Sequence, residues 1–184
     1  GELDKWFEWM EAHPDVGVSG PRLMNADGTD QESCYRFPNP LIPILRRTPL
    51  GRLPYFRDIV SRYRMEGLDR TKEHDLDWVL GAAHLIKRTT LEKIGRFDER
   101  FFLYFEDADV CRRVWLAGER VVYTPVACIL HYYQKQSQTK NIWQAFKNPV
   151  TRIHIASGFK YFAKYFGQPN PRVKFFKSRG MLVD

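Results

Sequence analysis

The sequence has few cysteines and no long apolar run. Its three cysteines, Cys34, Cys111 and Cys128, are odd in number and show no CxxC pairing. This argues against a disulfide framework or a zinc site and fits a reducing compartment. No apolar stretch approaches the roughly 20 residues that cross a bilayer, and we expect no signal peptide at the start of the chain. The fold is therefore predicted to depend on side-chain packing.

Acidic residues are also scarce, above all in the last forty-odd positions. Lys and Arg number 29 against 22 Asp and Glu, which gives a formal net charge of +7. Such a charge predicts an anionic partner, namely nucleic acid, an acidic membrane surface or a phosphorylated substrate, although a solvated basic surface explains it equally well. Because no RNP, zinc-finger or basic-helix pattern is present, we expect no nucleic-acid partner.

The length of 184 residues and the 43% hydrophobic content are those of one globular domain. Helical and strand patterns alternate along the chain, which predicts an α/β fold. The first segment repeats apolar residues at helical spacing and needs a core to cover them. These residues are Leu3, Trp6, Phe7 and Met10.

Turn and capping signals divide the chain further. "VGVSGPRL" reads as a strand, "NADG" as a turn and "TDQESCYRF" as the returning strand. Residues 37–76, with five prolines in "FPNPLIPILRRTPLGRLP", read as an irregular excursion with one short helix at 56–63. Thr89 and Glu92 have capping-box spacing before Gly95, and Pro125 is expected to stop the strand "RVVYTP".

One segment, "FFLYFEDADVCRR" at 101–113, runs from apolar residues straight into Glu106, Asp107 and Asp109. Acids at a helix N-terminus cap free N–H groups and favour the helix dipole, which is worth about 0.5–2 kcal/mol. Alternatively, an aromatic wall holds a carboxylate at the edge of a dry pocket, where it can take a proton from a hydroxyl. Spacing alone does not separate these interpretations.

The string from 77 to 137 resembles the second half of family 2 glycosyltransferases of the GT-A fold, most closely the bacterial rhamnosyltransferase-like branch. The segments that carry the resemblance are "DWVLGA", "GRFDERFF" and "EDADVCRR", followed by a strand, a His and a Ser. With "HPDVGVSGPRLMNADGT" upstream, it covers roughly residues 1–137. The matching positions are Trp78, Gly81, Ala82, Gly95, Phe97, Asp98, Glu99, Phe101, Phe102, Glu106, Asp107, Asp109, Cys111, Arg113, His131 and Ser137.

The resemblance implies a GT-A-like mixed sheet flanked by helices that lacks the N-terminal nucleotide-binding half. Residues 1–140 would be the acceptor-side half of the domain, with 37–76 as an insertion, and 141–184 a helical, basic-aromatic extension. The Asp-x-Asp metal motif of the missing half is not in this chain, since "DLD" at 75–77 and "DAD" at 107–109 fall in the wrong places. We therefore expect the isolated chain to be inactive, and its cut surface to favour self-association as a homo-oligomer.

Carried over by position, the resemblance implies that Asp107 is the general base of an inverting transfer. Glu106 and Asp109 would shape the acceptor pocket or hold Asp107, and Arg113 would pair with one of them.

The resemblance also assigns residues around this acid. Trp78 offers a flat face for a sugar ring, or is a core tryptophan. Gly81 would let the backbone approach the donor, or forms a plain turn, and its neighbour Ala82 would belong to the acceptor or substrate site. His131 would complete a divalent-metal site for Mn²⁺ or Mg²⁺, although a lone His after a strand is more often structural and the two tyrosines after it depart from the family pattern.

The implied function is transfer of a sugar, with dTDP-rhamnose as the first choice of nucleotide-sugar donor, to a cell-surface glycan or lipid-linked acceptor. We expect a cytoplasmic protein, peripheral at the inner face of the plasma membrane. Two other classes stay open. One is a non-catalytic module that binds a glycan or a partner protein. The other is a basic peripheral membrane binder that uses "TRIHIASGFKYFAKYF" against an anionic surface, where the alternative is a helix packed on the domain.

Overall fold

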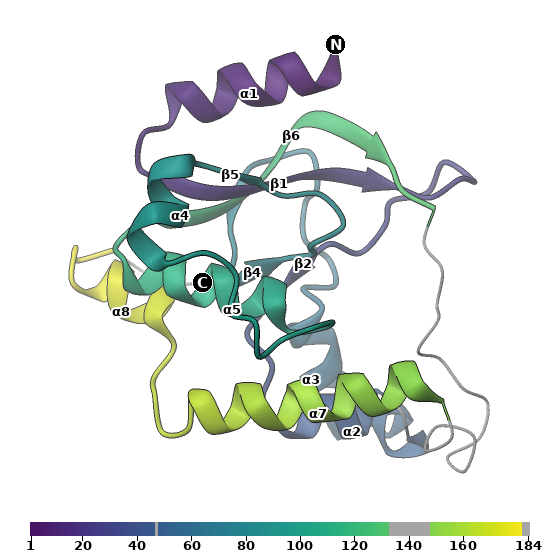
Figure 1. Ribbon diagram of the computed structural model, residues 1–184. Coiled ribbons are helices and arrows are strands. Elements are labelled where there is room, and N and C mark those ends of the chain that lie inside the picture. The colour runs from purple at the N-terminus through teal and green to yellow at the C-terminus, as the bar shows by residue number, and fades with distance from the viewer. Residues whose placement is uncertain (47, 133–147, 182–184) are drawn as a thin grey trace.

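The computed structural model describes residues 1–46, 48–132 and 148–181 (Figure 1). The expected boundary between 140 and 141, and Ser137, lie outside these residues. The elements are α1 (Glu2–Ala12), β1 (Val16–Met24), β2 (Cys34–Tyr35), α2 (Leu41–Leu45), the 3-10 helix η1 (Pro49–Arg52), α3 (Pro54–Tyr63), β3 (His74–Asp75), β4 (Trp78–Val79), β5 (Leu85–Ile86), α4 (Arg88–Ile94), α5 (Glu106–Leu116), β6 (Arg120–Leu130), α7 (Pro149–Lys164) and α8 (Pro171–Lys177).

A mixed sheet forms the centre of the molecule. Its strand order is β3-β6-β1-β5, in which β6 runs parallel to β1 while β3 and β5 are antiparallel to their neighbours. A second, two-stranded sheet pairs β2 with β4. In Figure 1, α1 lies on one side of the main sheet and α5 on the other. The predicted α/β fold, a mixed sheet flanked by helices, is confirmed.

Helix α5 supplies much of the core, because one of its faces is apolar throughout. Val110, Cys111, Val114 and Trp115 are all buried, as their spacing predicts. Trp115 packs against Phe175 and Phe176 of α8, and Tyr161 and Tyr165 of α7 belong to the same core cluster. The helices of the C-terminal part thus pack on the α/β part. None of the helices that the structure describes combines the length and apolarity that a bilayer crossing requires.

Strand β6 does not stop at Pro125, as the sequence suggested, but continues to Leu130. The pairing with β1 jumps from Pro21↔Thr124 to Arg22↔Cys128, so Pro125 sits in a bulge. On the other side of β6, within the described residues, β3 pairs only with Val122 and Tyr123. A proline is tolerated here because no neighbouring strand needs its missing N–H group.

Two local expectations were also wrong. After the predicted turn, which Gly28 closes with φ +82°, the chain touches β1 at one bridge, Met24↔Asp30, and β2 then pairs with β4. It cannot return along β1, since β6 already pairs along that strand. The capping box is absent because α4 begins at Arg88 and has Lys87 at its N-cap, although Gly95 ends the helix as predicted.

The apolar stripe of α1 is only half covered. Trp6 and Met10 are buried against the sheet, where the Trp6 Nε1–H donates to Ser19 Oγ at 2.8 Å. Leu3 and Phe7, one row to the side, remain more than half exposed. The predicted short helix at 56–63 is confirmed and begins two residues earlier, as α3.

Candidate active site

The acidic segment begins with an unusual turn. Tyr104 and Phe105, which immediately precede α5, both have φ +68°, a left-handed conformation that bulky residues rarely adopt. Helix α7 holds them there: Tyr104 stacks on His154 with ring centroids 4.2 Å apart, and Phe105 packs on Tyr161 at 5.2 Å. A side chain at Gly158 would place its Cβ 3.3 Å from the Phe105 ring. Aromatic packing therefore offsets the strain and fixes where α5 starts.

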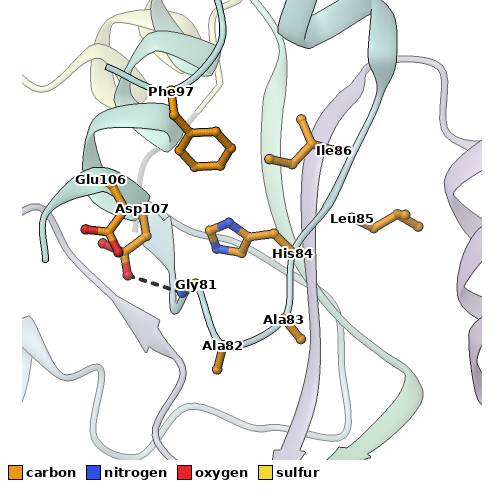
Figure 2. Close-up of a pocket in the computed structure, with 9 residues that line it drawn as sticks. All are labelled: Gly81, Ala82, Ala83, His84, Leu85, Ile86, Phe97, Glu106 and Asp107. Carbon is orange, nitrogen blue, oxygen red and sulfur yellow. Dashed lines mark hydrogen bonds between the residues drawn. The ribbon is translucent and has the colours of Figure 1, made fainter. Parts of the chain in front are cut away.

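Asp107 lies in the first turn of α5 and is mostly buried. Its Oδ1 accepts a hydrogen bond from the Ala108 N–H at 2.8 Å, and its Oδ2 accepts one from the Gly81 N–H at 3.1 Å (Figure 2). A Cβ on Gly81 would lie 3.3 Å from the Asp107 Cβ, so the missing side chain permits this approach. Burial raises the pKa of Asp107 to about 6, although the N–H groups of Gly81 and Ala108 oppose the rise.

A cavity of about 630 Å³ opens beside this carboxylate. Figure 2 shows Glu106 and Asp107 at one side, with the His84 imidazole projecting towards them below Phe97. The volume is in the range of small-molecule sites. The lining residues are Gly81, Ala82, Ala83, His84, Leu85, Ile86, Phe97, Glu106 and Asp107.

Glu106 carries a carboxylate oxygen, Oε2, that is buried and has no hydrogen-bond partner among the described residues. Burial, helped by the negative charge of Asp107, raises the pKa of Glu106 to about 7. Two adjacent carboxyl groups thus have pKa values close to neutral pH in a cavity. Such groups are suited to proton transfer and to hydrogen bonding with a polyhydroxyl ligand.

His84 was missed by the sequence analysis. Its Nε2 lies 2.8 Å from the Val79 carbonyl oxygen, which can only accept, so Nε2 carries the proton. Burial lowers the pKa of His84, which leaves Nδ1 as a hydrogen-bond acceptor on a neutral ring. Its place three residues after Gly81 in "GAAHLIKR" is the signal that could have pointed to it.

The raised pKa of Glu106 predicts how the free energy of unfolding changes with pH. The folded protein keeps this proton up to about pH 7, whereas the unfolded chain releases it near the ordinary glutamate pKa of 4.5. Across that window the unfolded chain binds fewer protons, so the free energy of unfolding falls as the pH rises. Glu106→Gln is expected to reduce this fall, as measured by urea denaturation at several pH values. The exposed Glu92→Gln is the control, and an unchanged slope in Glu106→Gln would contradict the prediction.

Asp109 points away from the cavity. The predicted pairing of Arg113 is confirmed, since its Nε donates to Asp109 Oδ2 at 2.8 Å. The Tyr165 hydroxyl donates to Asp109 Oδ1 at 2.6 Å, and Lys164 contacts the same oxygen. Asp109 therefore joins α5 to α7, Arg113 also donates to the Ile94 carbonyl at the end of α4, and neither residue lines the cavity.

Trp78 is not brought to the cavity either. It is buried, stacks on Tyr35 with ring centroids 4.4 Å apart, and donates from Nε1 to the Arg36 carbonyl at 2.8 Å. Gly81 and Ala82, which follow it, do line the cavity.

His131 lies just beyond the end of β6, and its Nδ1 is 2.9 Å from Gln31 Oε1. Across residues 1–46, 48–132 and 148–181, no group of three or more His, Cys, Asp or Glu side chains could hold a metal ion. The described residues thus do not form a metal site around His131, and its role as a ligand stays a prediction.

Known proteins match this chain over part of their length, although no protein-family model matches it. The N-acetylglucosaminyl-diphospho-decaprenol L-rhamnosyltransferase of Mycobacterium tuberculosis is 32% identical over 132 residues, which cover 72% of this chain and 42% of that protein. Rhamnosyltransferase WbbL of Escherichia coli K12 is 28% identical over 121 residues, 61% of this chain and 43% of that protein. The chain thus spans less than half the length of these curated relatives. The resemblance to rhamnosyltransferases that the motifs between residues 77 and 137 implied is thus confirmed as sequence similarity over this part of the relatives.

Proposed function

We propose that the longer protein containing this chain transfers a sugar from a nucleotide-sugar to a lipid-linked acceptor, with inversion at the anomeric carbon. Support comes from the relative whose name describes transfer of L-rhamnose to N-acetylglucosaminyl-diphospho-decaprenol. dTDP-rhamnose is the proposed donor, and this chain would supply the acceptor side of the site.

The observation that carries this proposal is the position of Asp107 at the cavity wall, held by the Gly81 N–H. With its pKa raised to about 6, this carboxylate is ionised at neutral pH and still basic enough to take a proton. In the proposed reaction the acceptor hydroxyl passes its proton to Asp107 while its oxygen attacks the anomeric carbon. The nucleoside diphosphate leaves from the opposite face.

Two neighbours favour a polyhydroxyl ligand in this cavity. Glu106 Oε2 lacks a partner among the described residues, and His84 Nδ1 is left as an acceptor. Both can receive hydrogen bonds from sugar hydroxyl groups, which would orient the ring for attack. We assign them a positioning role.

The divalent metal, Mn²⁺ or Mg²⁺, stays a prediction for the longer protein. The described residues do not assemble a metal site around His131.

The direct test is a transfer assay with dTDP-rhamnose and a polyprenyl-diphosphate-linked N-acetylglucosamine. The longer protein and the 184-residue chain are assayed side by side, and the lipid product is identified by mass spectrometry. We expect product with the longer protein and none with the chain alone. If a folded longer protein binds the glycan lipid but transfers sugar from none of a panel of nucleotide-sugars, the non-catalytic binding module becomes the better reading.

A further inference from the structure

The described residues 41–46 and 48–57 include exposed apolar and basic side chains on α2, η1 and the start of α3. These elements lie at the end of the molecule opposite α1 (Figure 1). We call this surface the basic-apolar face. Its residues are Leu41, Ile44, Arg46, Leu50, Arg52, Leu53, Tyr55 and Arg57.

The apolar side chains of the basic-apolar face are exposed to solvent. Their exposed fractions range from 48% for Leu50 to 74% for Tyr55. A different set of side chains, Ile42, Leu45 and Tyr63, anchors the same elements in the core. The same elements thus place one apolar set inward and leave a second set about half exposed or more.

The charge of this segment has one sign. From Ser33 to Arg57 the sequence contains five arginines and no acid. Arg46, Arg52 and Arg57 are exposed among the apolar side chains. Segments that present large apolar residues together with Lys or Arg are typical of the interface of an anionic bilayer.

Other occupants fit this face less well. A second copy of the chain, docked through the same face, would bring the arginines of both copies together, and like charges oppose such an interface. A nucleic acid would be bound by stacking on aromatic rings, whereas four of the five apolar members are aliphatic.

We propose that the basic-apolar face docks this protein on an anionic lipid bilayer. Leu41, Ile44, Leu50, Leu53 and Tyr55 enter the boundary between headgroups and acyl chains, and the arginines contact the lipid phosphates. This deepens the proposed function, because a lipid-linked acceptor is held in such a bilayer, but the docking itself requires no sugar transfer.

Co-sedimentation of the 184-residue chain with vesicles tests the proposal. We expect binding to vesicles of phosphatidylcholine and phosphatidylglycerol at low salt, and much weaker binding to phosphatidylcholine alone. The double variant Leu50→Glu/Leu53→Glu should lower the partition coefficient by about 100-fold, since both side chains leave the bilayer. Arg52→Glu/Arg57→Glu should lower it by about 30-fold on anionic vesicles and flatten the salt dependence.

Two matched controls distinguish binding through this face from non-specific binding of exposed apolar or charged side chains to vesicles. Leu3→Glu/Phe7→Glu removes two exposed apolar side chains from α1, and Arg88→Glu reverses an exposed charge on α4. Both should bind anionic vesicles like the wild type, and circular dichroism should show every variant folded. If the α1 variant loses as much vesicle binding as Leu50→Glu/Leu53→Glu, the assignment to this face is wrong.

The remaining outcomes are equally decisive. No binding of the wild type to anionic vesicles at low salt refutes the proposal. A concentration-dependent dimer that Leu50→Glu/Leu53→Glu abolishes, without vesicle binding, identifies a second copy as the occupant. A chain that binds vesicles while the longer protein lacks transferase activity contradicts only the proposed function.

Discussion

Replacing Asp107 with asparagine in the longer protein is expected to lower kcat for sugar transfer by roughly 10²–10⁴-fold, the usual contribution of a general base. The amide cannot take the hydroxyl proton, but its oxygen can still accept the hydrogen bond that the Gly81 N–H donates to Asp107. The loop at 81–83 and the donor affinity should therefore be retained. Steady-state kinetics gives kcat, and calorimetry gives the donor Kd.

The pH dependence makes this prediction sharper. Because Asp107 must be ionised to act as a base, kcat of the wild type should rise with pH up to a pKa of about 6 and then level off. The pH profile of kcat for the Asp107→Asn variant should lack this rise. Glu106→Gln, at the adjacent position, should affect KM more than kcat. A variant at Asp107 that keeps wild-type kcat would place the base elsewhere.

Asp109→Asn is expected to lower the free energy of unfolding by about 3 kcal/mol or more. The substituted residue does not line the cavity. Its carboxylate is 1% exposed and contacts both Arg113 and Lys164, which are themselves largely buried. Removing one partner of a buried ion pair leaves an uncompensated charge, which costs about 3–5 kcal/mol. Lys164 keeps its contact with Asp98, so the larger part of the loss should arise at Arg113. Urea denaturation measures the free energy of unfolding.

An exposed ion pair provides the control. Glu92→Gln breaks the pair between Arg88 and Glu92 on α4, where both side chains are mostly in solvent. Exposed pairs of this kind contribute about 0–1 kcal/mol. If Asp109→Asn costs no more than Glu92→Gln, the network between α5 and α7 does not stabilise the fold.

Local signals were sufficient for much of the fold. The helix end at Gly95 and the turn at Gly28 depend on residues close together in sequence, and both were predicted. The strand end predicted at Pro125 was wrong. A proline is tolerated there because it lies in a bulge against β1 and because, among the residues that the structure describes, β3 pairs with β6 only at Val122 and Tyr123. Those are properties of neighbouring strands, which a single sequence does not display.

The site was predictable in part for a similar reason. The family motifs pointed to Glu106 and Asp107, and the structure brings both to the cavity. Helical geometry alone separates Asp107 from Asp109, because two positions at about 100° per residue face opposite sides. For His84 the sequence offers only its place three residues after Gly81, and its hydrogen bond to Val79 is a property of the fold.

The left-handed turn at Tyr104 and Phe105 has a consequence for the order in which the protein folds. The rings that support it, His154 and Tyr161, stand about fifty positions later in the chain. During synthesis α5 therefore leaves the ribosome well before the partners that fix its first turn have been made. We therefore expect the two carboxylates to reach their final positions only when α7 docks, although α7 contributes no residue to the cavity lining.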